Sequence, residues 1–285
     1  MNNNISISQL ISLNLAKFTH IDISTKNDLQ MIICDVLGID KTYIYLNGDK
    51  ILDTNTIAKI NEKILRLING EPLAYILGYK HFWNQKLYVT KDTLIPRADT
   101  EIIVENILTD IQNKNLYLKI LDLGTGTGAI GLALASELPN SQVIAVDLYK
   151  STLDVAQKNA HTNNIKNIKF IQSNWYNNIV DTDFDIIVSN PPYIDKNDIN
   201  VDASVKNYEP LQALFSQDKG LADIKIIITQ AKYHLKKGGY LYIEHGFTQA
   251  NDVANIFATN NFINIKTFKD LNNKDRCTKG QLNHL

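Results

Sequence analysis

The feature that most constrains the fold is an alternation of apolar runs and amphipathic stretches, which begins near residue 100 and continues to the carboxyl end. Short runs rich in Ile, Val and Leu are typical of strands buried on both faces, and the stretches between them have helical spacing. Parallel strands need helical connections of this kind. The chain is therefore predicted to form an α/β fold, with a largely parallel sheet covered on both faces.

The predicted elements follow in order along the chain. Strands are predicted at 118–121, 142–146, 168–171, 184–189 and 240–243, followed by a closing pair of strands. Helices are predicted at 101–113, 129–138, 151–160, 222–236 and 248–258, with Ser151 as the cap of the third. The connection from Ile194 to Gly220 is long for this fold class, and such loops often cover substrates. We expect it to act as a lid.

The first part of the chain has a different pattern, because its apolar residues are spaced as in helices. An apolar stripe runs from Leu29 to Leu37 and ends at Gly38. A second helix is predicted to begin at a cap formed by Asn55 or Thr56 and to close at Gly70. The predicted domains are a small helical bundle at 1–78, a hairpin linker at 79–98 with residues 84–86 between its strands, and the α/β domain at 99–285.

Charge and composition limit the partners that this chain can have. The net charge is −1, so no overall positive field draws the protein to a phosphate backbone, and no direct nucleic acid contact is expected. Cys34 and Cys277 are the only cysteines, which gives neither a disulfide framework nor a metal site. The chain has no signal-peptide pattern and no apolar run long enough to span a membrane. A cytoplasmic monomer without membrane contact is expected.

A glycine loop follows the first predicted strand of the α/β domain. Gly124, Thr125, Gly126, Thr127 and Gly128 make a tight turn in which the backbone can approach a ligand closely. The spacing also fits a dinucleotide site, so the loop alone does not choose between a dinucleotide and S-adenosylmethionine.

Three side chains near this loop bear on the choice of cofactor. Asp147, at the end of the next strand, can hydrogen-bond a ribose diol in either cofactor. Asp122, just before the glycines, suits the cationic amino group of a methionine moiety better than a pyrophosphate. Trp175 follows the third strand, where it either stacks on an adenine or packs in the core. S-adenosylmethionine is the predicted cofactor, with S-adenosylhomocysteine as its product.

A second motif, Asn190-Pro191-Pro192-Tyr193, directly follows the strand predicted at 184–189. The Asn190 side-chain oxygen and the Pro191 carbonyl can both accept hydrogen bonds from one planar NH2 group, and Tyr193 offers a wall for it. Two acceptors aim the nitrogen lone pair at a methyl donor, and this orientation lowers the barrier without a strong base. Together with the glycine loop, the motif predicts methyl transfer to a planar nitrogen. Asn190, Pro191 and Tyr193 are the predicted catalytic residues, and Asn190 to Tyr193 the predicted substrate site.

Several segments resemble the bacterial glutamine N5-methyltransferases that modify class I peptide chain release factors. The resemblance runs from about residue 28 to 280, and its motifs are 70–78, 94–101, the Asp122 glycine loop, Asn174-Trp175, Asn190 to Tyr193, 208–210 and 244–246. It implies a small helical amino-terminal domain and a seven-stranded, Rossmann-like methyltransferase domain. It also implies that the methyl acceptor is the amide of Gln in the Gly-Gly-Gln tripeptide of the release factor.

By matching motif positions, the resemblance assigns cofactor contacts to Gly124 through Gly128, Asp147, Trp175 and Asn190. Two positions depart from the family pattern. Ala98 stands where Pro usually follows the Arg of the Ile-Pro-Arg segment, and Asn174 stands where an acidic residue often precedes the Trp. The first loosens that turn, and the second puts a charged contact to the cofactor in doubt.

Three further residues have open roles. Arg97 and Arg276 are two of only three arginines and fall within family motifs, which suggests sites that need a planar, bidentate cation. Arg97 is expected either near the cofactor or release-factor surface or in a structural ion pair. His245, after the strand at 240–243, is expected to be a packed, hydrogen-bonded residue rather than a base.

Other classes of function remain as alternatives. A nucleic-acid amino methyltransferase, acting on adenine N6 or on guanine N2 of rRNA, would use a similar Asn-Pro-Pro-aromatic motif, but such enzymes usually carry a basic recognition domain. The predicted bundle instead contains acidic residues among its lysines. A non-catalytic cofactor-binding assembly factor would not need an intact Asn190 and Tyr193. A dehydrogenase would need an acid–base group that no motif supplies.

Overall fold

The computed structural model describes residues 5–18, 23–199 and 201–283. The chain divides into two compact units, Met1–Gly78 and Tyr79–Leu285. The sequence motifs for cofactor and acceptor all fall in the second unit, so its sheet is the part of the fold that positions a site.

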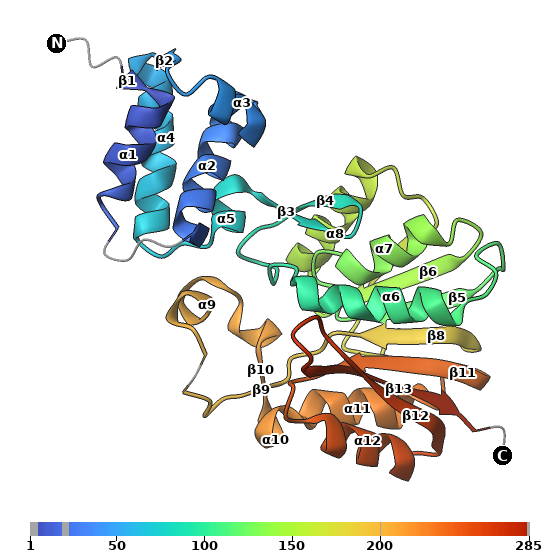
Figure 1. Ribbon diagram of the computed structural model, residues 1–285. Coiled ribbons are helices and arrows are strands. Elements are labelled where there is room, and N and C mark those ends of the chain that lie inside the picture. The colour runs from blue at the N-terminus through green and yellow to red at the C-terminus, as the bar shows by residue number, and fades with distance from the viewer. Residues whose placement is uncertain (1–4, 19–22, 200, 284–285) are drawn as a thin grey trace. The chain divides into compact units, whose positions relative to one another are not determined.

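The first unit is a helical bundle with one short strand pair (Figure 1). Its helices are α1 (Ile7–Leu15), α2 (Ile23–Leu37), α3 (Lys41–Leu46), α4 (Thr54–Ile68) and α5 (Leu73–Leu77). Strand β1 (Ile5–Ser6) pairs antiparallel with β2 (Ile51–Leu52). The interior is almost entirely aliphatic, with Leu29, Ile32, Ile33, Ile60 and Ile64 among the buried side chains.

The start of α4 differs from the sequence prediction. Asp53, not Asn55 or Thr56, is the cap: its side chain accepts a hydrogen bond from the Thr56 backbone N–H, at 3.0 Å. A carboxylate at this position also interacts favourably with the positive end of the helix dipole. Asn55 and Thr56 lie inside the first turn instead. The predicted ends of α2 and of α4 agree with the structure, because Gly38 and Gly70 adopt positive φ angles.

The second unit is built on a seven-stranded sheet, in the order β12-β13-β11-β8-β5-β6-β7. The strands are β5 (Lys119–Leu123), β6 (Gln142–Asp147), β7 (Ile168–Gln172), β8 (Phe184–Ser189), β11 (Leu235–Glu244), β12 (Phe262–Lys269) and β13 (Asp275–Leu282). Neighbouring strands from β11 to β7 are parallel, whereas β13 runs antiparallel to β11 and β12. The prediction of a mostly parallel, seven-stranded α/β sheet is confirmed.

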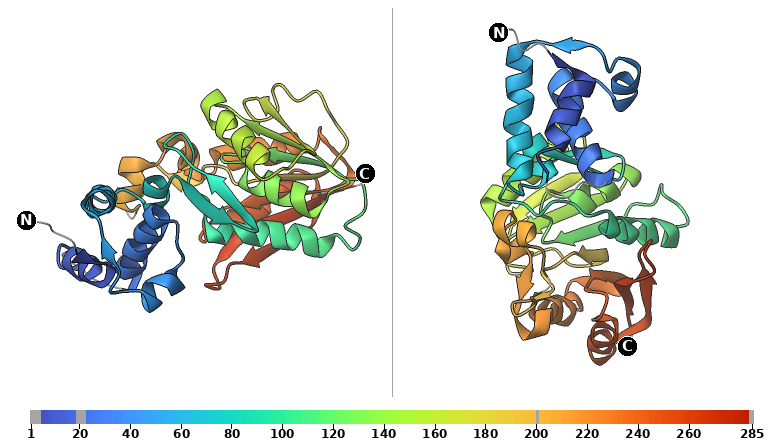
Figure 2. Two further views of the ribbon diagram at one scale, coloured as in Figure 1. Left: turned by 90° about the horizontal axis from the view of Figure 1, so that it is seen from above. Right: turned by 60° about the vertical axis from the view of Figure 1, so that its left-hand side comes forward.

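Helices cover both faces of this sheet (Figures 1 and 2). They are α6 (Glu101–Asp110), α7 (Ala129–Glu137), α8 (Lys150–Thr162), α11 (Ala222–Ala231) and α12 (Ala250–Thr259). Successive residues of β5 serve opposite faces: Ile120 packs in the cluster with α6 and α7, and Leu121 in the cluster with α11 and α12. This two-residue period explains why the strands read as continuous apolar runs.

Two helix predictions in this unit are wrong in detail. Ser151 does not cap α8, because the helix already begins at Lys150 and Tyr149 precedes it without a side-chain cap. The helix predicted at 222–236 ends at Ala231, and Leu235 through Gly239 belong to β11. The pairing of β11 with β8 shifts register between Leu235 and Tyr240, so the glycines there lie in an irregular part of the strand.

Two connections have more structure than the sequence indicated. Strands β3 (Tyr79–Phe82) and β4 (Gln85–Tyr88) form a hairpin, so Gln85 and Lys86 lie in its second strand rather than between the strands. The long connection contains β9 (Ile194–Asp195), α9 (Ala203–Tyr208), the 3-10 turn η2 (Leu211–Ala213), β10 (Phe215–Ser216) and α10 (Gln217–Gly220). Strands β9 and β10 pair in parallel, which ties the two ends of that connection together.

Candidate active site

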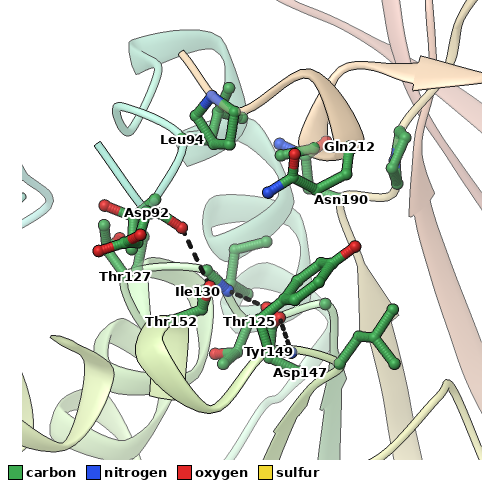
Figure 3. A pocket seen from close by; sticks show the side chains of 18 of the residues that line it. Asp92, Leu94, Thr125, Thr127, Ile130, Asp147, Tyr149, Thr152, Asn190 and Gln212 are labelled. Atoms are coloured by element: carbon green, nitrogen blue, oxygen red, sulfur yellow. Dashed lines mark hydrogen bonds between the residues drawn. The ribbon is translucent and has the colours of Figure 1, made fainter. Parts of the chain in front are cut away.

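A cavity of about 220 Å³, partly open to solvent, lies at the carboxyl ends of the central parallel strands. Open α/β sheets bind ligands at this edge, because strand order reverses there and the connecting loops diverge. Residues after β5, β6, β7 and β8 all contribute to its walls. Figure 3 shows Asn190 and Gln212 on one side of the cavity, and Thr125, Tyr149 and Asp147 on the other.

The glycine loop forms the floor of the cavity. Gly124, Thr125, Gly126 and Thr127 line it, and Gly128 is buried just behind them at the start of α7. Gly124 has a φ of +68°, and a Cβ atom there would lie 3.3 Å from the Trp175 ring. A side chain at this position would therefore be strained in conformation and would crowd the indole.

Asp147 connects the loop to the end of β6. Its carboxylate accepts hydrogen bonds from the backbone N–H groups of Gly126 and Tyr149, both at 3.1 Å. Burial raises the pKa of this carboxyl above its usual value, and the two backbone hydrogen bonds oppose the rise. Each oxygen keeps a lone pair beyond the one it already uses, so the carboxylate can still accept from a diol.

Asp122 occupies a different place from the one expected. It is buried beneath the loop, where Oδ2 accepts from the Thr125 hydroxyl at 2.6 Å and from the Gly131 N–H at 3.0 Å. It is not among the residues that line the cavity. Burial raises its pKa to about 6. The side chain therefore holds the loop against α7 from below, which the sequence position alone could not reveal.

Trp175 lines the cavity with its ring beside Gly124. The residue has a φ of +48°, an uncommon conformation for a bulky side chain, so the surrounding contacts hold it in place. The ring also packs against the apolar core on one side. Core packing is thus confirmed for this side chain, and stacking on an adenine stays a prediction for its cavity side.

The Asn-Pro-Pro-Tyr segment contributes two side chains to the cavity wall, Asn190 and Pro192. Pro191 is buried, and Tyr193 does not line the cavity. The Asn190 Nδ2 atom donates to the Thr100 hydroxyl oxygen, at 3.1 Å. The Tyr193 hydroxyl donates to Glu244 Oε1, also at 3.1 Å. The segment is therefore held from behind by residues of two distant elements.

Glu244 is the centre of this supporting cluster. It lies at the end of β11 and is only 1% exposed. Burial raises its pKa to about 7, and the Tyr193 hydroxyl, which donates to Oε1, opposes that rise. The charge of Arg276 opposes it further. The carboxyl therefore changes its charge near neutral pH.

A further buried carboxylate, Glu209, joins two walls of the cavity. Its Oε2 atom accepts from the Ile95 backbone N–H at 3.1 Å, and its Oε1 atom pairs with Arg97. The segment before α6 is thereby tied to the segment before η2, and Arg97, Pro210 and Gln212 all line the cavity. Thus Arg97 lies both in an ion pair and at the cavity. Sequence reasoning did not assign a role to Glu209 or Gln212.

Arg276 and His245 take structural positions near the site. Arg276 pairs with the buried Asp270 at 3.0 Å and with Asp99 at 3.5 Å. His245 is fully buried, with Nε2 2.8 Å from the Thr278 hydroxyl and Nδ1 2.9 Å from the Gly246 carbonyl. Burial lowers the pKa of its imidazole. The expectation of a packed, hydrogen-bonded histidine is confirmed.

The arrangement fits a nucleoside cofactor with a methionine tail. It offers an aromatic face at Trp175, a carboxylate for a diol at Asp147, and a glycine loop open to close approach of a ligand. Within the described residues, no cluster of His, Cys, Asp and Glu could hold a metal ion. No helix in the same part of the chain is both long and apolar enough to cross a membrane.

Two sequence families match parts of the chain. Residues 19–78 match the family described as the PrmC N-terminal domain, and residues 98–208 match the Methyltransferase small domain. Whole-chain relatives are similar as well. A release factor glutamine methyltransferase of Francisella tularensis is 70% identical and covers 99% of both chains. The enzyme of the same name from Escherichia coli is 39% identical and covers 90% of this chain and 92% of its own.

Solved structures support the fold alone. A methyltransferase of Pyrococcus furiosus has a TM-score of 0.54 at 16% identity, and the match covers 78% of this chain and 99% of that one. The 16S rRNA N2 G1207 methyltransferase of T. thermophilus, solved with AdoMet and guanosine, has a TM-score of 0.53 at 16% identity. That match covers 72% of this chain and 49% of the other.

Proposed function

The chain belongs to the family of release factor glutamine methyltransferases, and we propose from this premise that it methylates class I peptide chain release factors. The methyl group goes from S-adenosylmethionine to the side-chain amide nitrogen, N5, of the Gln in their Gly-Gly-Gln tripeptide. One observation carries the assignment of the site: Asn190 lines the same cavity as the glycine loop. A donor and an amide acceptor bound there would meet.

The proposed cofactor site uses the floor and one wall of the cavity. Gly124 through Thr127 would lie along the cofactor, with Gly128 fixing the turn, Asp147 would accept from the ribose hydroxyls, and Trp175 would contact the base. Asn190 adjoins both ligands. When bound, S-adenosylmethionine supplies a methyl group on a positively charged sulfur. Binding residues on rigid strand ends keep that group in one place.

The proposed acceptor site is the Asn-Pro-Pro-Tyr segment. The Asn190 Oδ1 atom and the Pro191 carbonyl accept the two hydrogens of the Gln amide, so the nitrogen lone pair turns toward the methyl group. Pro192 lines the cavity, and it and Tyr193 are proposed as the surface on which the planar amide rests. The amide proton becomes acidic only as the new bond forms, so no strong base is required in the wall.

The proposal also covers partners and location. Because the chain has a net charge of −1, we propose that it acts on the protein factor without direct nucleic acid contact. We also propose that it is a monomer in the cytoplasm, where release factors work. We propose the helical unit as a docking element for the factor, joined through residues 79–98 to the methyltransferase domain at 99–285. Deletion of residues 1–78 should then weaken binding of the factor, and unchanged affinity would remove the docking role.

The test is methyl transfer from labelled S-adenosylmethionine to several acceptors. The acceptors are purified release factor, the same factor with Gln→Ala in its tripeptide, total DNA, and rRNA. Label should enter the wild-type factor alone and should be lost with the enzyme variant Asn190→Ala. Label in nucleic acid with the factor untouched would instead favour a methyltransferase of exocyclic base amines.

A further inference from the structure

The inference concerns Gln212, and it rests on the proposed function. The acceptor Gln follows two glycines, which have no side chains and offer only backbone N–H and C=O groups to an enzyme. A glycine segment also loses much conformational freedom when it is held in one place. The Asn-Pro-Pro-Tyr segment supplies acceptors for the side-chain amide of the acceptor Gln. Holding the backbone beside that side chain takes a further polar group at the cavity.

Gln212 has the chemistry and the position for this role. It lies in η2, lines the cavity and is exposed, so a protein substrate can reach it from solvent. Figure 3 shows its side chain on the same side of the cavity as Asn190. A side-chain amide carries an acceptor oxygen and a donor NH2 group, which match the N–H and the C=O of a peptide backbone. Pro210 and Ala213, which also line the cavity there, have no polar side chain.

The turn η2 is held on its amino-terminal side by Glu209. This buried carboxylate accepts from the Ile95 backbone N–H at 3.1 Å and pairs with Arg97. Pro210 follows directly, and its ring fixes φ, so little backbone freedom remains between Glu209 and the turn. The Ala213 N–H donates to the Pro210 carbonyl at 2.9 Å, which closes the turn around its middle residue.

The other side of the turn is bonded to the end of the acceptor motif. The backbone carbonyl of Leu214, just after η2, accepts from the Ile194 N–H at 3.0 Å. Ile194 directly follows Tyr193 and begins β9, which pairs with β10. Asn190 and Gln212 therefore stand on two backbone segments that are hydrogen-bonded to each other. Such ties hold the two amide side chains ready for one ligand before it binds.

We propose that Gln212 is a substrate-binding residue, which hydrogen-bonds to the backbone C=O and N–H of the glycines that precede the acceptor Gln. Asn190 then holds the side chain of the acceptor residue, and Gln212 holds the main chain that carries it. No bond changes at the glycines during methyl transfer. The Gln212 contact is therefore made equally in the bound substrate and in the transition state, so it raises affinity and leaves kcat unchanged.

The experiment measures two quantities for each protein: the dissociation constant of the release factor from enzyme saturated with S-adenosylhomocysteine, and kcat at saturating factor and cofactor. Gln212→Ala should weaken binding of the factor about tenfold, because two hydrogen bonds are lost, with kcat close to the wild-type value. Gln212→Glu keeps the length of the side chain but loses the NH2 donor, and should also weaken binding. Gln217→Ala is the matched control, since Gln217 is an exposed glutamine of the same connection that does not line the cavity.

The release factor with Gln→Ala in its tripeptide separates a backbone contact from a contact to the acceptor side chain. Its backbone is intact, so Gln212→Ala should weaken its binding to the same extent, whereas Asn190→Ala should hardly affect it. Unchanged affinity of Gln212→Ala for the wild-type factor, or a loss that disappears with the Gln→Ala factor, would overturn the inference. So would weaker binding of S-adenosylhomocysteine, which would place Gln212 against the cofactor. A wild-type enzyme that does not methylate the factor at all would instead refute the proposed function.

Discussion

The two units of the chain differ in the charge of the polar side chains that they bury. In the helical unit the buried cluster is aliphatic, and the buried polar side chains among its described residues, Ser6, Asn14 and Gln30, carry no charge. In the methyltransferase unit the buried side chains include Asp122, Glu209 and Glu244. Buried carboxylates cost folding free energy unless they are paired and hydrogen-bonded. Buried carboxylates around the cavity therefore lower the folding stability of the second unit. The described residues of the first unit carry no such cost.

The largest effect is expected at the cavity wall and should concern activity alone. Asn190→Ala removes an acceptor from the proposed substrate site, and loss of one such preorganised group typically lowers kcat by about 10² to 10³. The melting temperature should change little, because the side chain is only partly buried. Steady-state kinetics on the release factor would measure this. Asn197→Ala, an exposed asparagine farther along the same connection, should behave as wild type.

The next effect should separate the interiors of the two units. Ile60→Ala empties part of the aliphatic core of the helical unit, where Ile60 is fully buried, and should destabilise it by about 3 kcal/mol. Leu65→Ala on the same helix is the matched control, because Leu65 is 58% exposed and should lose far less. Hydrogen exchange of the α4 amides would report both. Cofactor affinity should be unchanged, since every residue that lines the cavity belongs to the other unit; a weakened affinity would show coupling between the two.

Glu244→Gln should make the protein more stable at pH 8. The carboxyl has a pKa of about 7 in the fold and 4.5 ordinarily, so it binds more protons when folded than when unfolded. Its burial therefore lowers stability as the pH rises from about 4.5 to about 7, and the full cost is present above that. Each pKa unit corresponds to about 1.4 kcal/mol, and the gain at pH 8 should be about 3 kcal/mol. Urea unfolding at pH 8 and pH 5 tests this: an equal effect at both pH values would contradict it.

The smallest effect should come from a helix cap. Asp53→Ala removes the acceptor for the first turn of α4 and should cost about 1 kcal/mol. Asn55→Ala should cost much less. Asn55 was also a predicted cap, but it lies within the first turn of α4. Thermal unfolding of the two variants side by side decides between them. Equal losses would show that the cap is shared.

Local patterns predicted the fold well, because each helix or strand has a characteristic hydrophobic pattern in consecutive residues. The strands ending at Leu123, Asp147 and Ser189 follow apolar runs, and the sheet edge at which they end then follows from parallel order. Helix ends were harder to predict, because several polar residues near the start of α4 could all serve as caps. The actual cap, Asp53, lies two residues before Asn55 and three before Thr56.

Only part of the candidate site could be predicted from the sequence. The residues that line the cavity from the two motifs could be named, because each motif is continuous. Thr100, Glu209 and Glu244 could not be given roles, since they act by reaching across the fold to Asn190, Ile95 and Tyr193. Asp122 was misplaced for a related reason. Its side chain could point up to a ligand or down under the loop, and only the packing of Gly131 against it settles the direction.

The indole of Trp175 gives the protein a built-in optical reporter. The chain has only two tryptophans, and the other, Trp83, lies in the β3–β4 turn with its ring N–H bonded to Glu137, away from the cavity lining. A Trp83→Phe variant would leave a single emitter, whose ring borders both the glycine loop and the open volume. Its emission would register each arrival and departure of a cofactor directly, so occupancy could be timed in solution without any label.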